Sequence, residues 1–120
     1  MKIFDQITGW LIVGLGLVHC CVTTVFFKHF SINALWFFGS GLALVVVGAL
    51  NLLRIQYAAE APGARIVCVA ANVAIFFFTL AIGAAIPLRQ NPQAALGIVL
   101  ATLALGFSVF RRGRSVAVKA

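Results

Sequence analysis

Residues 8–27 read TGWLIVGLGLVHCCVTTVFF, a stretch that contains no charged side chain. A helix needs roughly 20 consecutive, mostly apolar residues to cross the hydrocarbon core of a bilayer. This stretch has that length and composition. It is too long for the apolar region of a signal peptide and lacks a small-residue cleavage site, so we expect it to be retained as a first transmembrane helix.

Three more apolar stretches follow, at about residues 34–53, 66–86 and 93–110. The connections are short, so consecutive helices must pack antiparallel. The chain is 63% hydrophobic and only 9% charged, and its mean hydropathy is +1.13, which excludes an ordinary soluble domain. We therefore predict an all-α membrane protein in which residues 1–120 form one membrane domain, an antiparallel bundle of four transmembrane helices.

The placement of the basic residues predicts an orientation. The net charge is +7, and the Lys and Arg residues number 9. Four spans put both termini and the middle connection on one side of the membrane. Seven basic residues belong to that side: Lys2, Arg54, Arg65, Arg111, Arg112, Arg114 and Lys119. Only Lys28 and Arg89 belong to the other. The positive-inside rule then places both termini in the cytoplasm. These charges are placed to meet lipid headgroups, so we expect the lipid bilayer, and no nucleic acid, as their partner.

Polar residues predict where the helices begin and end. Ser31 or Asn33 is placed to cap the second helix, and Arg54 to end it. Residues 55–64 form the longest polar connection. Asn91 is a candidate cap for the fourth helix, with a proline at its first position. We expect the basic tail after the fourth helix to be mobile.

Small residues four apart predict close packing of helices. Such pairs let helix backbones approach each other, either inside the bundle or between two copies in a homodimer. The pairs are Gly39 and Ala43, Ala70 and Ala74, Ala81 and Ala85, and Gly97 and Ala101, in addition to Gly9, Gly14 and Gly16 in the first helix.

His19 is the most informative single residue. It is expected near the middle of the first span, where an ionisable side chain is costly and faces the bundle interior or a cavity. Ile12, Gly16 and Thr23 share its helical face. A purely structural role would be a neutral imidazole that is hydrogen-bonded to a neighbouring helix. Candidate partners for that bond are Ser40, Asn72 and Thr79. The functional alternatives are proton handling, a hydrogen bond to a ligand, or metal ligation.

Two buried amides and three cysteines complete the set of candidates. Asn51 and Asn72 can each bridge helices. Cys20 and Cys21 are similar to the vicinal pair of mercury-uptake membrane proteins, but those proteins also use a second pair at the membrane surface, which this chain lacks. We expect Cys20, Cys21 and Cys68 to act as small apolar residues.

The absence of acidic residues from the predicted spans bears on transport. Small multidrug transporters have this length and helix count but exchange protons through a glutamate in the first helix. Both acids of this chain, Asp5 and Glu60, fall outside the predicted spans, so His19 would have to titrate instead. Loss of proton-coupled flux in a His19→Gln variant would favour this reading. No nucleophile, base and orienting group converge in the sequence, so we expect no enzyme.

The first two helices carry a resemblance. The residues from Gly14 to His19, with Thr23, Phe27, the run from Leu35 to Ala43 and Leu50-Asn51, resemble small bacterial membrane proteins of four helices. The resemblance implies the four-helix fold and a bacterial inner membrane, but no activity. Any site that it implies would be built from His19, Trp36, Ser40 and Asn51.

These observations lead to three ranked hypotheses. The first is a small multi-pass inner-membrane protein that binds an apolar or amphipathic molecule, or a partner helix, beside His19, with a homodimer as one assembly. The second is a transporter of the small multidrug type, and the third is metal or haem binding through His19. No cofactor or metal site is assigned. The candidate ligand-binding residues are His19, Thr23, Trp36, Ser40, Asn51 and Asn72.

Overall fold

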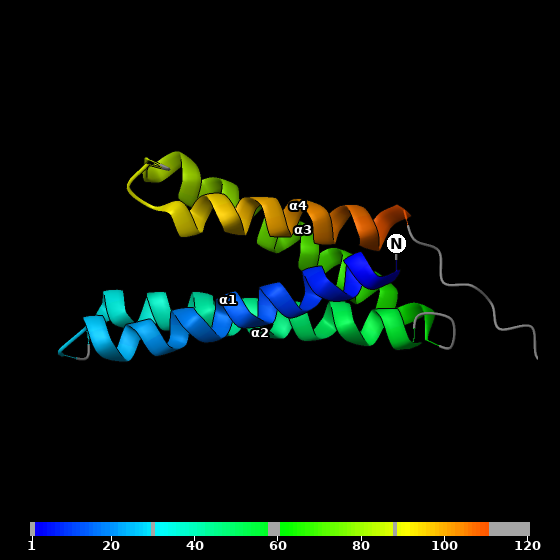
Figure 1. Cartoon of the computed structure of the whole chain (residues 1–120), viewed down its shortest axis with the longest axis horizontal. Helices are drawn as coiled ribbons and strands as arrows, with labels where there is room; N and C mark the ends of the chain where they lie inside the picture. The colour runs from blue at the N-terminus through cyan, green and yellow to red at the C-terminus, as the bar shows by residue number, and fades with distance from the viewer. Residues whose placement is uncertain (1, 30, 58–60, 88, 111–120) are drawn as a thin grey trace, which may run out of the picture.

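The protein is a bundle of four α-helices (Figure 1). The computed structural model describes residues 2–29, 31–57, 61–87 and 89–110. The helices are α1 (Lys2–Phe26), α2 (Ile32–Tyr57), α3 (Pro62–Ala85) and α4 (Pro92–Phe110). Each is long and apolar enough to cross a membrane. The predicted fold class, an all-α bundle of four such helices, is confirmed.

Three of the helices extend beyond the predicted spans. α1 begins at Lys2 instead of about residue 8, so Asp5 lies inside it. α2 continues through Arg54 to Tyr57, and α3 begins at Pro62. Two predictions were therefore wrong: that no acid lies within a span, and that Arg54 ends the second helix. Most of the predicted connection 55–64 is helical. Glu60 and the basic tail, residues 111–119, lie outside the described residues.

The ends of the helices follow the local sequence. The Ser31 hydroxyl accepts a hydrogen bond from the Ala34 amide at 3.2 Å, which confirms the predicted cap of α2. Ile86 is extended (φ −126°, ψ 126°) because it precedes Pro87, and α3 ends there. Asn91 does precede α4, but its side chain does not cap the helix: Oδ1 has no hydrogen-bond partner among the described residues.

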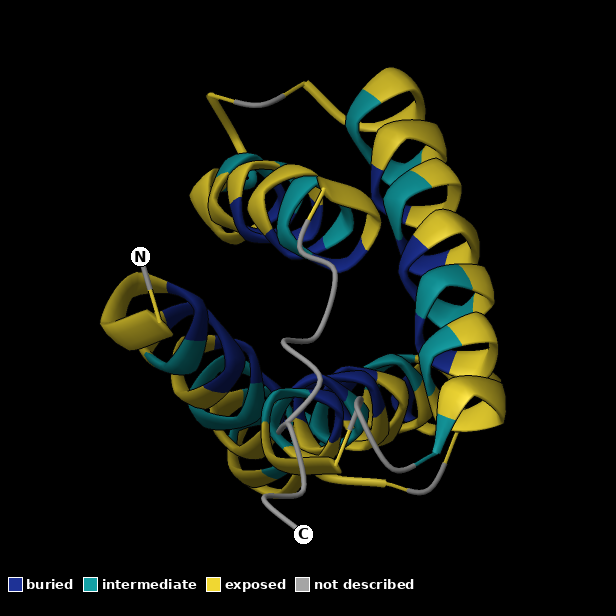
Figure 2. Ribbon diagram, turned by 90° about the vertical axis from the view of Figure 1, so that its right-hand side faces the viewer, coloured by how far each residue is buried: buried dark blue, intermediate teal, exposed yellow. Residues whose placement is uncertain are grey.

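The helices form a ring in which each helix packs against the next along the chain and α4 packs against α1 (Figure 2). We call the end that holds the start of α1, the α2–α3 connection and the end of α4 the proximal end. The distal end holds the α1–α2 and α3–α4 connections. Figure 1 shows the α1–α2 hairpin and the α3–α4 hairpin diverging toward the distal end.

Glycines bring the backbones of α1 and α2 into close contact. A Cβ atom added at Gly16 would lie 2.5 Å from the carbonyl oxygen of Gly41, and one added at Gly41 would lie 2.8 Å from that of Gly16. Seven residues along each helix, an added Cβ at Gly48 would lie 2.9 Å from the carbonyl oxygen of Gly9. The two helices can approach this closely only because these positions lack side chains.

The core lies at the centre of the ring, where Ile12, Leu44, Ile75 and Leu100 meet, one from each helix. The outward faces of the helices are exposed (Figure 2). They carry many large apolar residues, as expected for a surface that faces lipid. Only one of the predicted small-residue pairs is buried, Gly97 with Ala101. The other pairs are exposed: Gly39 with Ala43, Ala70 with Ala74, and Ala81 with Ala85. Packing within the bundle was therefore the wrong role for the exposed pairs, and their role in a homodimer stays a prediction.

Candidate functional site

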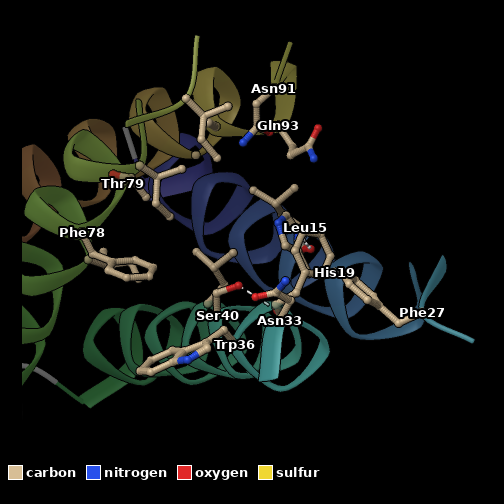
Figure 3. Close-up of a pocket in the computed structure, with 17 residues that line it drawn as sticks. Leu15, His19, Phe27, Asn33, Trp36, Ser40, Phe78, Thr79, Asn91 and Gln93 are labelled. Atoms are coloured by element: carbon tan, nitrogen blue, oxygen red, sulfur yellow. Dashed lines mark hydrogen bonds between the residues drawn. The ribbon is translucent and has the colours of Figure 1, made fainter. Parts of the chain in front are cut away.

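A partly open cavity of about 350 Å³ occupies the distal half of the bundle, where the two hairpins diverge (Figure 3). This volume is within the range of small-molecule sites, roughly 300–1,000 Å³. All four helices contribute to its wall. Among the described residues its polar lining consists of His19, Asn33, Ser40, Thr79, Asn91 and Gln93. The remaining lining is aromatic, aliphatic or glycine, and no described lining residue is charged.

His19 lies on the α1 side of this cavity. Its Nδ1 is 3.1 Å from the carbonyl oxygen of Leu15, one turn earlier in the same helix. The ring stacks on Phe37 of α2 at a centroid distance of 4.7 Å. The predicted hydrogen bond to a side chain of a neighbouring helix was therefore wrong. A neutral imidazole that donates from Nδ1 keeps Nε2 as an acceptor, and Nε2 has no hydrogen-bond partner among the described residues.

His19 does not lie at the midpoint of α1. Because α1 begins at Lys2 and ends at Phe26, its midpoint is residue 14. His19 is five residues further on, which is about 8 Å at 1.5 Å per residue. The side chain thus belongs to the distal half of the helix. It still lies on the predicted inward face, since Ile12, Gly16 and Thr23 are buried.

Two hydroxyl groups, one from α2 and one from α3, complete the deeper polar lining. Ser40 of α2 donates its proton to the carbonyl oxygen of Phe37 at 2.7 Å. Thr79 of α3 donates to that of Phe76 at 2.9 Å. Each hydroxyl group has a single proton, so both oxygens offer only lone pairs to the cavity.

The rim of the cavity includes exposed aromatic side chains. Trp36 of α2 is 71% exposed and Phe78 of α3 is 44% exposed, yet both line the cavity. In Figure 3 they extend from neighbouring helices on the same side of the site. Asn33 and Gln93, near the distal ends of their helices, are exposed as well. The cavity therefore has an edge on the outer surface between α2 and α3, where a molecule dissolved in lipid could enter.

The structure places the six predicted site residues at three separate locations. His19, Trp36 and Ser40 line the cavity together. Thr23 is one turn beyond His19, donates to its carbonyl oxygen at 2.8 Å, and borders a separate hollow at the distal end. Asn51 and Asn72 do not line the cavity; they form a buried pair in the proximal half.

That amide pair joins α2 to α3 and satisfies its own hydrogen bonds. Asn51 Nδ2 donates to Asn72 Oδ1 at 2.8 Å, and Asn72 Nδ2 donates to Asn51 Oδ1 at 3.0 Å. The buried Cys68 thiol donates to Asn51 Oδ1 at 3.5 Å. Asn72 also reaches the carbonyl oxygen of Ala104 in α4 at 3.3 Å. The predicted bridging role of these amides is confirmed, and the contact holds the proximal half of the bundle together.

A buried ion pair lies closer to the proximal end than the two amides. Arg54 Nη2 donates to Asp5 Oδ1 at 2.6 Å, and the two side chains are 2% and 1% exposed. Arg54 Nη1 is 3.5 Å from the carbonyl oxygen of Phe107 in α4. The pair thus joins α1, α2 and α4 at the proximal end. We call Asp5, Asn51, Arg54, Cys68 and Asn72 the proximal polar layer.

Sequence reasoning missed the ion pair, because the signal for it, an acid and a base on adjacent helices, also needs the register of α1 against α2, which the structure supplies. In the antiparallel register of α1 and α2, Gly16 faces Gly41 and Gly9 is close to Gly48. Continuing that register toward the proximal end brings Asp5 close to Arg54. An acid and a base at matching depths of two adjacent antiparallel helices predict a pair, because an isolated charge in lipid is costly.

In the part of the chain that the structure describes, no three His, Cys, Asp or Glu side chains lie close enough together to bind a metal ion. Cys20 is half-buried and Cys21 is exposed.

Comparisons with protein-family models, curated proteins and solved structures found no match for the chain. The resemblance of the first two helices therefore stays a prediction.

Proposed function

We propose that this protein is an integral membrane protein that binds an apolar or amphipathic small molecule in the distal cavity beside His19. The single observation that carries the proposal is the cavity itself. Four apolar helices that only needed to pack would close on each other along their whole length. Here the proximal half is closed by the proximal polar layer, while the distal half leaves about 350 Å³ between the hairpins.

The chemistry of the wall supports a ligand with a large apolar part. Phe37, Leu44, Ile75 and Ile82 line the cavity together with a few uncharged polar atoms. Ligand sites generally combine a mostly apolar wall with a small number of polar groups that orient the ligand. The exposed rim residues Trp36 and Phe78 favour entry from the lipid. Binding needs no catalytic group, in keeping with the expectation that the chain is not an enzyme.

A transporter of the small multidrug type is the second candidate. The observation in its favour is that the cavity reaches one end of the bundle while a polar layer closes the other. The local geometry of His19 suits both candidates, because Nδ1 donates to the Leu15 carbonyl oxygen and Nε2 is left to accept either a proton or a hydrogen bond from a ligand. For metal binding through His19, no group of three potential ligand side chains is found among the described residues.

The binding proposal is tested by filling the cavity. Ser40 lines the cavity, whereas its neighbour Gly39 is exposed on the outside of α2 and has no neighbouring atom within 4 Å of an added Cβ. The probe is decanol carrying a photoreactive diazirine on its chain, applied to the full protein in lipid nanodiscs. We expect saturable labelling of cavity residues in the wild type and in Gly39→Phe. In Ser40→Phe we expect that labelling to fall by about tenfold or more, because the phenyl ring occupies the ligand volume.

Circular dichroism and size-exclusion chromatography of both variants check that they fold alike. Labelling that cannot be saturated in the wild type, or that is equal in the two variants, would contradict the proposal.

We further propose a bacterial inner-membrane location with both termini in the cytoplasm. The charge bias remains after the structure is considered: Arg54 is paired, but six of the seven basic residues on that side are left against Lys28 and Arg89. The proposal predicts the labelling of single cysteines introduced after Cys20, Cys21 and Cys68 are replaced by alanine. A membrane-impermeant maleimide should label Lys28→Cys in intact cells, and Gly63→Cys only after permeabilisation. The opposite pattern would reverse the orientation.

A further inference from the structure

The polar side chains deep in the distal cavity share one chemical property: each already donates its single proton to a carbonyl oxygen of its own helix. Ser40 Oγ donates to the Phe37 carbonyl oxygen, and Thr79 Oγ1 donates to the Phe76 carbonyl oxygen. His19, as a neutral imidazole, donates from Nδ1 to the Leu15 carbonyl oxygen. A hydroxyl group and a neutral imidazole each have only one such proton. Toward the cavity, all three side chains can therefore act only as acceptors.

The hydrogen-bond donors of the cavity wall lie further out. Asn33, Gln93 and Trp36 carry N–H groups, and all three residues are exposed at the mouth or the rim of the cavity. Asn91 also lines the cavity and carries an Nδ2 donor, whereas its Oδ1 is buried and offers no acceptor to a ligand.

The absence of charged groups from the described lining narrows the choice of the ligand group that can donate to these acceptors. No Asp or Glu is among the described residues that line the cavity. A protonated amine would therefore enter a half-enclosed apolar site without a counter-ion, which is costly. A carboxylate has no proton to donate and would face several acceptor lone pairs. An uncharged hydroxyl group meets neither obstacle.

We infer that the distal cavity selects an uncharged amphiphile whose hydroxyl head donates hydrogen bonds, a molecule of the long-chain alcohol class. This inference rests on the proposed ligand-binding function and specifies its ligand. The head lies among His19, Ser40 and Thr79, and the chain extends along Phe37 and Phe78 toward the rim at Trp36. Entry between α2 and α3 lets the molecule pass from the bilayer without losing its apolar surroundings.

The test is competition against the photoreactive decanol probe in nanodiscs that contain the wild-type protein. The competitors are decanol, decyl methyl ether, which has the same chain but no proton to donate, and decanoate in its ionised form. Each concentration is expressed per lipid, so that differences in partitioning are removed. We expect decanol to compete at about a tenfold lower concentration than the ether, because the one hydrogen bond that the hydroxyl proton donates is lost. Decanoate should compete most weakly.

Isosteric variants then assign the preference to the acceptor atoms. Thr79→Val removes a cavity acceptor, whereas Thr102→Val removes a hydroxyl that makes the same kind of intrahelical bond (2.7 Å to the Ile98 carbonyl oxygen) on the exposed side of α4. The ratio of ether to decanol concentrations should fall in Thr79→Val and in Ser40→Ala. It should stay unchanged in Thr102→Val.

The outcomes separate the two proposals. Saturable labelling with equal competition by decanol and the ether, or stronger competition by decanoate, overturns the inference and leaves the ligand-binding function standing. A preference for decanol that neither Thr79→Val nor Ser40→Ala reduces also overturns it. Labelling that does not saturate, and that no competitor reduces, overturns both the inference and the ligand-binding function.

Discussion

Asp5→Asn is expected to destabilise the protein by about 3–5 kcal/mol, because it leaves the charge of Arg54 buried without a carboxylate. The Arg54 side chain is 2% exposed, and its contact with Asp5 Oδ1 at 2.6 Å is its shortest described polar contact. Asparagine has almost the same shape as aspartate, so the loss would come from charge and not from packing. The free energy of unfolding, measured by titration with a denaturing detergent, checks the size of the effect.

A double variant separates the cost of an unpaired charge from the value of the pair. When both members of a buried ion pair become apolar or neutral, stability is often unchanged or higher. Asp5→Asn combined with Arg54→Met should therefore recover most of the stability that Asp5→Asn loses. Lys28→Met, which removes an exposed cation at the distal end, should change stability by less than about 1 kcal/mol. A double variant no more stable than Asp5→Asn would show that the charges are not the cause.

Gly16→Ala is expected to destabilise the bundle by about 1–3 kcal/mol through overpacking. The added methyl group would lie 2.5 Å from the Gly41 carbonyl oxygen and 2.7 Å from the Val45 amide nitrogen. Both are backbone atoms, so no side chain can rotate away and the two helices must separate. Gly41→Ala meets the same obstacle from the other helix, at 2.8 Å from the Gly16 carbonyl oxygen. Thermal unfolding in detergent would measure both variants.

The matched controls lie two residues away on the same helices. An alanine Cβ at Gly14 or at Gly39 would meet no atom within 4 Å. Gly14→Ala and Gly39→Ala should be neutral or slightly stabilising, because alanine is the better helix former. Equal losses at Gly14 and Gly16 would mean that glycine flexibility, and not close contact of the backbones, matters in α1.

The separation of Gly14 from Gly16 illustrates a limit of sequence reasoning. Both residues lie in the same apolar stretch, and the spacing of small residues gave no reason to choose between them. Gly97 and Ala101 were placed correctly in the core, but Gly39 and Ala43 proved to be exposed. In lipid, inner and outer helix faces are both apolar, so composition does not reveal which face packs.

Because inner and outer helix faces are both apolar, the residues of the candidate site could be predicted only in part. His19, Trp36 and Ser40 could be singled out because polar and aromatic residues are conspicuous in apolar spans, and they do line one cavity. Asn51 and Asn72 were singled out on the same grounds but bind each other in the proximal half. Depth along a helix depends on where the helix begins, and α1 begins earlier than its apolar stretch because Asp5 finds Arg54 inside the bundle.

The stretch of residues 8–27 and its three successors were enough to determine four helices in alternating directions, since backbone groups in lipid must be hydrogen-bonded within their own segment and short connections allow no other order. Only the tertiary structure decided which small residues bring α1 and α2 together, which charges pair, and that the hairpins diverge distally around a cavity. Those features depend on the register and tilt of one helix against another. Register and tilt are set by contacts between residues far apart in the chain, such as Gly16 with Gly41 and Asp5 with Arg54, and each contact is visible only when both partners are in place.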